Sequence, residues 1–427
     1  MLPQGLIFVI MVAAFMATAF GLKLPIGICL AIASMSGAIS AGQGIALRHL
    51  VEGSFGYLNT ILVIGAAMMF MKAIQKSGLL DTVARWLVET FYRSRALLLV
   101  GLTVLVMFPG MITGSSTASV LTAGALVAPV LMALGVPRKR TAAMIAMAGI
   151  YGMLAPPVNI PAMIIGGGID MPYVGFGLPL LFATLPLAVV VSLILGLPHM
   201  KRLTGIDGIR DELPESYHKA YGLRLYTPFI VLVVLMMGPN ILPGRFPDLG
   251  MPFVFLISAV VACLTGRPTN MWRIAREAVH DSLPVMGILM GVGMFIQVMT
   301  LTGVRGWVVA NALGMPKALL YLAIAISMPA FGAVSAFGSS SVLGVPFILA
   351  LLGTHNEIVA TAALSLLAGL GDLVPPTALA GIFAAQVVDE ENYFTVLREC
   401  VIPFVLTAVW AVIILRWSVP LARILVR

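Results

Sequence analysis

Long apolar stretches separated by short polar loops fill this chain from end to end. A helix needs about 20 mainly apolar residues to cross a bilayer, and stretches of that length recur throughout the sequence. Inside lipid the backbone must satisfy its own hydrogen bonds, as helices do, so the pattern predicts an all-α polytopic membrane protein. In the first half the expected spans are 6–22, 24–40, 58–77 and 174–197, with amphipathic stretches at 45–53 and 79–92.

Two further apolar stretches of the first half, 96–134 and 141–165, are interrupted in the middle. In the first, the polar sequence GSST at 114–117 divides a run that is too short on either side to cross, which predicts a re-entrant helical hairpin. In the second, Pro156 and Pro157 should break the helix at mid-membrane, because proline removes a backbone donor. Such breaks persist only where they are buried or line a cavity, and carriers place substrate and ion sites there.

After a polar link at 199–224 the same order of segments begins again. Single residues match too, since Phe70 and Gly78 lie 225 positions before Phe295 and Gly303. Further matches are Gly114-Ser115-Ser116 with Gly338-Ser339-Ser340, 224 positions on, and Pro156-Pro157 with Pro375-Pro376. We therefore expect two repeats, residues 1–198 and 225–427. The second should hold spans at 227–241, 251–265, 283–302 and 401–419, amphipathic stretches at 272–281 and 305–313, a hairpin at 316–352 and a broken helix at 358–388.

Each repeat then contains five crossings and one hairpin, so the second repeat must start on the opposite side of the membrane. The repeats are therefore expected to be inverted. Lys and Arg residues gather in the loops of one side, which include 138–140 and the 199–224 link. By the positive-inside rule that side is cytoplasmic. This makes 199–224 a cytoplasmic linker in a prokaryotic inner-membrane protein, with both termini periplasmic.

Composition excludes a soluble globular protein. Hydrophobic residues make up 60% of the chain, charged residues 10%, and the mean hydropathy is +1.07, whereas soluble domains are about 45 to 50% apolar. The segment 1–20 lacks a basic n-region and is expected to be a retained span. The net charge of +8 is spread over short loops, which favours membrane orientation over nucleic-acid binding. The three cysteines lack CxxC spacing and are expected to be packing residues.

The two tips and two breaks are expected to meet near the mid-plane and to form the site. Helix N-termini suit a carboxylate, while helix C-termini and unwound carbonyls suit a small cation such as sodium. The alternative is that the hydroxyls only bond carbonyls of their own or a neighbouring helix. We expect substrate at Ser115, Ser116, Thr117 and Asn159 in the first repeat and at Ser339, Ser340, Ser341 and Thr377 in the second.

Asp372 is the one acid predicted to lie inside a membrane-depth element, in the sequence GLGDLVPP, with no basic residue near it in the sequence. Ionisable groups inside the bilayer are costly and commonly functional. Asp372 would then bind a cation or carry a proton. Alternatively, its carboxyl stands at a water-filled vestibule or stays protonated. The sequence leaves both readings open.

The GSST tip, the APPVN break that follows it, the LVPPTAL break and the chain length resemble the large membrane subunit of tripartite ATP-independent periplasmic (TRAP) transporters, the DctM-like proteins of the ion transporter superfamily. The resemblance covers nearly the whole chain. It implies an elevator-type secondary carrier that couples sodium to the uptake of a small organic anion, commonly a dicarboxylate or sugar acid. It also implies two partners, a small membrane subunit and a periplasmic substrate-binding protein, and no cofactor apart from coupling sodium ions.

The same resemblance implies two sodium sites, one between each tip and the break of its own repeat. The residues concerned are Gly114, Ser116, Gly149, Gly152 and Ala155 for the first site, and Gly338, Ser340, Gly369, Asp372 and Val374 for the second. The second tip, SAFGSSSVLGVP, is richer in serine than that family shows, and Asp372 also departs from it. A stand-alone symporter of the superfamily, or a proton-coupled antiporter, is therefore the alternative.

An intramembrane enzyme is the competing class of protein. The five histidines fall in loops or at span ends, so a Ser-His or metal-ligand set is not expected at the mid-plane. The motif GxxxxGK[ST] does not occur, which argues against ATP drive within this chain. We therefore expect a transporter and not an enzyme.

Overall fold

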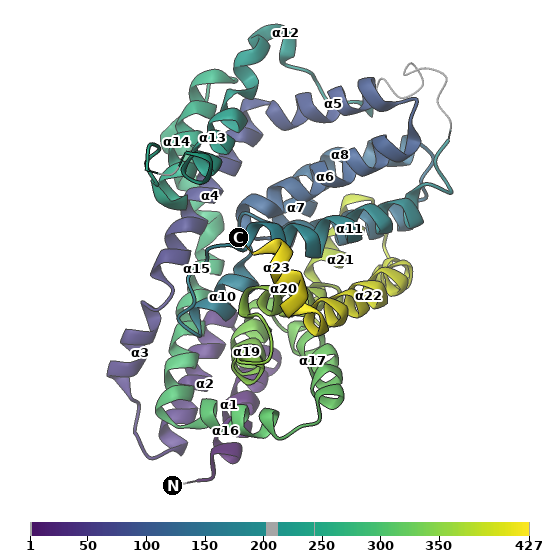
Figure 1. Ribbon diagram of the computed structural model, residues 1–427. Helices are drawn as coiled ribbons and strands as arrows, with labels where there is room; N and C mark the ends of the chain where they lie inside the picture. Colours follow the sequence, from purple (N-terminus) through teal and green to yellow (C-terminus); the bar gives the residue numbers. More distant parts are fainter. Residues whose placement is uncertain (1, 202–211, 243, 427) are drawn as a thin grey trace.

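The computed structural model describes residues 2–201, 212–242 and 244–426. Every regular element in these ranges is a helix, so the predicted all-α membrane fold is confirmed (Figure 1). Among the described residues, eight helices are long and apolar enough to cross a membrane. Residues 202–211 of the predicted 199–224 linker lie outside the described residues.

The helices of the first half follow the predicted order. They are α1 (Gln4–Met16) with a π-helical turn (Ala17–Gly21), α2 (Ile26–Ser40), α3 (Leu47–Ser54), α4 (Leu58–Ser77) and α5 (Leu79–Phe91). The hairpin region consists of α6 (Arg95–Thr113), α7 (Ser116–Ser119), a π-helical turn (Val120–Gly124) and α8 (Ala125–Ala133). The broken helix consists of α9 (Arg138–Leu154) and α10 (Ile160–Gly167), and α11 (Gly177–Gly196) follows it.

The second half repeats this order after a short helical connection, α12 (His218–Tyr221) and a 3-10 turn (Gly222–Tyr226). Then come α13 (Thr227–Ile241), α14 (Gly250–Thr265), α15 (Met271–Leu301) and α16 (Val304–Leu313). The second hairpin region consists of α17 (Lys317–Gly332), α18 (Ala336–Ser339), a π-helical turn (Ser340–Gly344) and α19 (Val345–Leu351). The second broken helix is α20 (Glu357–Gly369), a 3-10 turn (Leu370–Leu373) and α21 (Leu379–Val387), followed by α22 (Tyr393–Arg416) and α23 (Ser418–Leu425).

The predicted division between 272–281 and 283–302 is wrong, because α15 runs through both segments without interruption. Asn270 caps its N-terminus by accepting from two backbone N–H groups. The acidic groups of its first turns pair with lysines of α4: Lys72 lies 2.5 Å from Asp281, and Lys76 pairs with Glu277. Since these charges have partners on the neighbouring helix, the polar segment continues directly into the apolar one.

The last predicted span, 401–419, also has a different start. α22 begins at Tyr393, where the side chain of Asn392 accepts a hydrogen bond from Phe394 N at 3.0 Å and caps the helix. An N-cap of this kind sets the start of a helix independently of hydropathy. The helix therefore begins eight residues before the apolar stretch from which the span was predicted.

The helices sort into two groups by their packing contacts. In the first group, called here the α15 group, α15 packs against α2, α3 and α4, α14 packs against α4 and α13, and α1 packs against α2. In the second, the α9 group, α9 packs against α6, α11, α21 and α22, and α20 packs against α10, α17 and α22. The second arms of the hairpins also belong to the α9 group, because α7 and α8 pack against α9 while α18 and α19 pack against α20. α5 and α16 contact both groups, and α4 contacts α6 and α15 contacts α18 directly across the boundary. Figure 1 shows the α15 group along the left side of the molecule and the α9 group at the centre and right.

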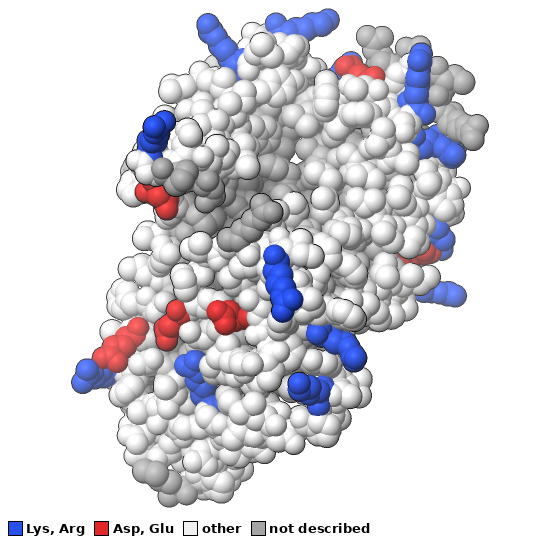
Figure 2. Space-filling model, in the orientation of Figure 1, with Lys and Arg blue, Asp and Glu red and all other residues white. Residues whose placement is uncertain are grey.

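Most of the surface on the face in Figure 2 is uncharged, as suits a protein surrounded by lipid. Charged side chains stand singly or in small groups. The same view shows a hollow between the part formed by α13 and α14 and the part formed by α6 and α11. The hollow therefore lies along the boundary between the two groups of helices.

Close contacts between glycines bring the helices of the α15 group together. A Cβ on Gly27 of α2 would lie 2.3 Å from the carbonyl oxygen of Gly287 in α15. A Cβ on Gly53 of α3 would lie 2.6 Å from the carbonyl oxygen of Gly293. Small residues let membrane helices approach closely enough for extensive van der Waals contact. These glycines therefore set how closely α2 and α3 approach α15.

Candidate functional site

The first hairpin turns at the position that the sequence suggested. α6 ends at Thr113, Gly114 takes a left-handed conformation with a φ of 65°, and Ser115 is extended. Glycine is suited to the positive φ because it has no Cβ. The Ser115 Oγ accepts a hydrogen bond from Ala118 N at 3.2 Å and caps the following helix. The turn thus presents a helix N-terminus, that of Ser116–Ala133.

The first break packs against this tip. Between α9 and α10 the chain leaves the helix, and the Pro156-Pro157 peptide bond is cis. Val158 N donates to Met111 O at 3.1 Å, which ties the break to the end of α6. A Cβ on Gly114 would lie 2.5 Å from the side chain of Ile160, at the start of α10. The tip and the break of the first repeat therefore form one packed unit.

Two glycines of α9 allow the backbones to approach. A Cβ on Gly149 would lie 3.0 Å from Ser116 O, and one on Gly152 would lie 2.3 Å from Met107 O. Ala155 N donates to Gly152 O at 3.1 Å at the end of the helix. Of the residues implied for the first sodium site, the structure thus places Gly149 directly beside Ser116, while Gly152 faces α6.

The second tip does not lie at Gly338–Ser340. The chain turns at 333–335, between α17 and α18, and Gly338 lies inside α18. Ser335 is extended, with φ −165° and ψ 123°, and its Oγ accepts from Gly338 N at 3.1 Å. Ser335 therefore caps the second arm of its hairpin as Ser115 caps the first, and the match between the two GSS sequences is out of register by four residues.

Ser339, Ser340 and Ser341 consequently lie in the first turns after the tip. All three are fully buried, and their hydroxyls donate to Met328 O at 2.7 Å, Ala336 O at 2.9 Å and Gly338 O at 3.0 Å respectively. Each hydroxyl is thus hydrogen-bonded to a carbonyl of its own hairpin. This favours the alternative that these serines stabilise the hairpin over the prediction that they bind substrate.

The second break packs against the true second tip. Its Pro375-Pro376 peptide bond is also cis. Thr377 donates to Ala333 O through its Oγ1 at 2.6 Å and through its backbone N at 3.3 Å. A Cβ on Gly371 would lie 2.1 Å from the carbonyl carbon of Gly332. Thr377 thus lies where break and tip meet.

The five residues implied for the second sodium site come from the second hairpin and the second broken helix, which pack against each other, and their binding of sodium stays a prediction. The atoms nearest to a Cβ on Gly338 would belong to Ser335 and Phe331 of its own hairpin, while a Cβ on Gly369 would lie 2.5 Å from the side chain of Leu154 in α9. The Ser340 hydroxyl is bonded within α18 and its continuation, and Val374 N donates to Gly371 O within the break. At the turn itself, Gly332 and Ala333 contact the break at Gly371 and Thr377, where the prediction expected Gly338 and Ser340.

Asp372 instead faces the first repeat. Its Oδ2 accepts a hydrogen bond from the Ser116 Oγ at 2.5 Å, and its side chain is buried, with the residue 7% exposed. Within the described ranges no Lys, Arg or His lies at ion-pair distance from it. This contact joins the tip of the first hairpin to the break of the second repeat, and it leaves a buried carboxyl with a neutral partner.

Asn159 joins the first break to α20, the first helix of the second broken helix. Its Oδ1 accepts from Ala162 N at 2.9 Å and caps α10, while its Nδ2 donates to Leu154 O at 2.7 Å and to the Ser365 Oγ of α20 at 3.0 Å. The side chain is fully buried. Its polar atoms are therefore used to hold the break, and Asn159 positions the site without offering free groups to a solute.

Thr117 and Ser115 are the predicted residues at the first tip that remain partly exposed. Three residues of this region lay outside the prediction: Ser335, Ser365 and Ser119. The spacing from Ser335 to Gly338, which matches that from Ser115 to Ala118, was an available signal for the first. The Ser119 Oγ is buried without a hydrogen-bond partner and lies 2.5 Å from where a Cβ on Gly110 would be. Nothing in the local sequence distinguishes Ser119 or Ser365 from other helical serines.

The region contains few groups suited to a transition metal. Within the residues that the structure describes, no three His, Cys, Asp or Glu side chains are gathered in one place. The two tips and the two breaks bring together hydroxyls, one carboxyl, backbone carbonyls and helix ends. Such oxygen ligands suit hard cations.

Comparison with known proteins supports the membrane fold. The family model described as "Tripartite ATP-independent periplasmic transporter, DctM component" matches residues 9–421. The YdaH transporter of Alcanivorax borkumensis has a similar structure, with a TM-score of 0.61, 18% identity and 86% of each chain covered. MtrF of Neisseria gonorrhoeae, described with a class of antimetabolite efflux pumps, has a TM-score of 0.62 and 14% identity. The match covers 98% of this chain and 95% of the MtrF chain. No curated protein sequence matches this chain significantly.

Proposed function

The chain belongs to the family of DctM components of TRAP transporters, which are secondary-transport permeases, and from this premise we propose that it imports a small organic anion together with sodium by an elevator-type movement. Membership of this family also implies that the chain lies in a lipid bilayer and associates with a substrate-binding protein and a small membrane subunit. The family is one of membrane transporters and not of enzymes.

The contact between Ser116 and Asp372 is the observation that carries the proposal of cation coupling. A buried carboxylate is costly unless a positive charge accompanies it, and here the partner is a hydroxyl. A sodium ion held by the carboxyl, the hydroxyl and nearby backbone carbonyls would supply that charge. Sodium is a hard cation for which such oxygen ligands are suited.

The helix ends support an anionic substrate. The second arms of both hairpins, Ser116–Ala133 and Ala336–Leu351, begin at the capped turns. Their N-termini carry partial positive charge, which stabilises a carboxylate. Ser115 and Thr117, both partly exposed at the first tip, would contact it. A dicarboxylate or sugar acid matches this combination of hydroxyls and helix N-termini.

The division of the helices supports the elevator movement. Few hydrogen bonds of the described residues cross between the groups. Tyr57 OH, between α3 and α4, donates to Ile164 O of α10 at 2.8 Å, and Arg305 of the connecting helix α16 donates to Gly168 O at 2.5 Å. The hairpins and broken helices all belong to the α9 group. In an elevator the α9 group would move as a unit against the α15 group, with α5 and α16 as connecting arms.

The test uses sodium itself as the probe. Binding of ²²Na⁺ to the purified permease is measured together with its melting temperature in sodium chloride and in choline chloride at equal ionic strength. A ligand that binds only the folded state raises the apparent stability, so we expect a higher melting temperature in sodium. Ser116→Ala should weaken sodium binding at least tenfold, about 1.4 kcal/mol. Ser34→Ala, which removes an equally buried hydroxyl from α2, is the matched control.

Uptake of labelled succinate and glucuronate then tests the substrate class, in cells that express the chain with its partner subunits. Absence of sodium binding would overturn sodium coupling. Dependence of uptake on pH alone would favour the proton-coupled alternative, which the same buried carboxyl also fits. Sodium binding without uptake of either acid would overturn the assignment to dicarboxylates and sugar acids.

A further inference from the structure

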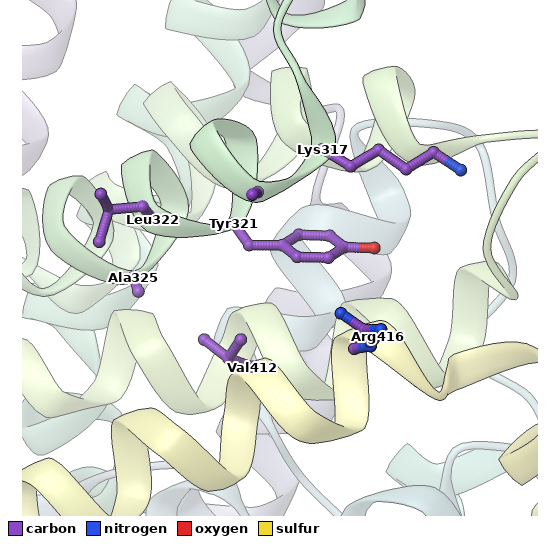
Figure 3. A pocket seen from close by; sticks show the side chains of 7 residues that line it. Lys317, Tyr321, Leu322, Ala325, Val412 and Arg416 are labelled. Atoms are coloured by element: carbon purple, nitrogen blue, oxygen red, sulfur yellow. The ribbon is translucent and has the colours of Figure 1, made fainter.

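A cavity of about 580 Å³ lies between α17 and α22, away from the tips and breaks. Its lining residues are Lys317, Ala318, Tyr321, Leu322, Ala325, Val412 and Arg416. Figure 3 shows the polar ends of Lys317, Tyr321 and Arg416 on one side of the cavity and the apolar side chains on the other. The cavity therefore has a charged end and an apolar end.

The charged end lies where two membrane helices terminate. Lys317 is the first residue of α17 and Arg416 is the last of α22. Among the described residues neither has an acidic side chain within ion-pair distance. Trp417, which follows Arg416, is 57% exposed, and tryptophan at a helix end is typical of the headgroup region. Two positive charges without acidic partners thus stand at the expected level of the lipid headgroups.

The apolar end lies deeper along the same helices. Ala325 is eight residues after Lys317, which is about 12 Å along a helix, and Val412 is four residues before Arg416, about 6 Å. Leu322 is 56% exposed on the outer face of α17. The lining thus changes from basic to aliphatic over the distance from a phosphate group to the start of an acyl chain.

Tyr321 and His355 complete the charged end without adding charge. Tyr321 OH and His355 Nε2 lie 2.7 Å apart, and Thr354 Oγ1 lies 2.8 Å from His355 Nδ1. Burial, together with the nearby charge of Lys317, lowers the pKa of His355. The imidazole is therefore neutral at neutral pH, and the positive charge of the cavity comes from Lys317 and Arg416.

We propose that this cavity binds a glycerophospholipid with a negatively charged headgroup, the phosphate lying between Lys317 and Arg416 and an acyl chain lying along Leu322, Ala325 and Val412. Basic pockets between membrane helices recognise anionic headgroups, and the aliphatic end distinguishes a lipid from a free anion. The proposal is independent of the proposed function. It concerns an anchoring site on the outer face of the α9 group.

The experiment compares lipids on the purified full-length protein in detergent. Phosphatidylglycerol and phosphatidylcholine with identical acyl chains are added at equal concentration, and the melting temperature and the lipid retained after gel filtration are measured. Inorganic phosphate and glycerol 3-phosphate form the soluble arms. We expect phosphatidylglycerol to raise the melting temperature by several degrees more than phosphatidylcholine, and the soluble anions to have no comparable effect.

Variants of the charged end and of the apolar end locate the effect. Lys317→Gln and Arg416→Gln should each remove more than half of the difference between the two lipids, and the double variant should remove it. Arg423→Gln, which removes an exposed basic charge from α23 near the same end of the chain, is the matched control. Ala325→Leu fills the apolar end and should weaken retention of both lipids while leaving the charges in place.

Each remaining outcome overturns the proposal. Equal shifts with the two lipids in the wild-type protein would show that the headgroup is not recognised, whatever the variants do. An equal shift with inorganic phosphate would assign the site to a soluble anion. An undiminished lipid difference in a folded double variant would place the lipid elsewhere on the protein.

Discussion

Asp372 and Ser116 form the one direct side-chain hydrogen bond between the first hairpin and the second break among the described residues. Every other polar group at this meeting point is a hydroxyl, an amide or a backbone group. A carboxyl in such surroundings stabilises the protein only when a cation or a proton compensates its charge. At the residue scale the site is therefore defined by the buried carboxyl of Asp372, which has a hydroxyl and no basic side chain as its partner.

Asp372→Asn should separate the structural role of this residue from its role in binding a cation. The amide keeps the shape and a hydrogen bond with Ser116 but removes the charge. In choline chloride the variant should melt at or above the wild-type temperature, because an uncompensated buried charge is gone. In sodium chloride it should lose the sodium-dependent increase. Melting curves in the two salts measure both effects.

Asp389→Asn is the control for this variant, since it removes an exposed acid from the loop after α21 and should leave the sodium dependence unchanged. A sodium-dependent increase that persists in Asp372→Asn would show that the ion lies elsewhere.

Asn159→Ala should destabilise the protein through lost hydrogen bonds. The change removes the cap of α10, worth about 1 kcal/mol, and leaves Leu154 O buried without its donor, at about 1 to 3 kcal/mol. We expect a loss of about 2 to 4 kcal/mol, measured by denaturant or thermal unfolding in detergent. Asn311→Ala removes an exposed amide that donates to Trp307 O, and it should change stability by less than about 0.5 kcal/mol. Equal effects of the two changes would contradict the role given to Asn159.

At the scale of helices and turns, hydropathy and proline placed most elements within a few residues. The hairpins and broken helices show in the sequence as apolar runs interrupted by polar residues or by paired prolines. The expectation that each arm of the first hairpin is too short to cross was wrong, because Arg95–Thr113 and Ser116–Ala133 are both long and apolar enough, and re-entry itself stays a prediction. The first residues of the helices were harder to predict from the sequence, because capping side chains such as those of Asn270 and Asn392 set them through single hydrogen bonds. Hydropathy does not record such bonds.

The register of the second tip shows how the site differed from expectation. Two serine-rich sequences were matched by their letters, whereas the structure matches Ser115 with Ser335, 220 positions apart. Pro109 and Pro329 of the preceding helices have the same spacing. The cap is defined by an extended backbone and a bond to the N–H three residues on. The sequence SAFGSSS, residues 335–341, contains four serines, and the one that caps the helix follows Pro329 at the same spacing at which Ser115 follows Pro109.

The crossing of α2 and α15 offers a test of glycine packing on two facing residues. Gly27→Ala would place a Cβ 2.3 Å from Gly287 O, so α2 must move away or the protein must lose stability. We expect a loss of about 1 to 3 kcal/mol, the cost of overpacking. Gly287→Ala meets no atom within 4 Å and should be neutral or stabilising by about 0.5 to 1 kcal/mol, because alanine favours the helix. Thermal unfolding of both variants measures the contrast, and equal losses would refute the assigned contact.

At the scale of the whole molecule, the two halves repeat one order of helices. The α9 group contains both hairpins and both broken helices. The order was predictable because each segment has its own hydropathy. The contacts between halves were not, since Ser116 with Asp372 and Asn159 with Ser365 join residues more than 200 positions apart. The inverted relation of the halves and the periplasmic position of both termini stay predictions.

Movement of the α9 group against the α15 group can be tested at a contact between them. A Cβ on Gly167 of α10 would lie 2.8 Å from the ring of Tyr57, which lies between α3 and α4, and Tyr57 OH donates to Ile164 O. Cysteines at 57 and 167, joined by a short bis-methanethiosulfonate reagent, would tie the two groups together. If transport requires the α9 group to move, sodium-dependent uptake should fall at least tenfold on cross-linking and return on reduction. Each single-cysteine variant with the reagent is the control. Full activity of the cross-linked protein would contradict the elevator movement, because the two groups would then be transporting while fixed.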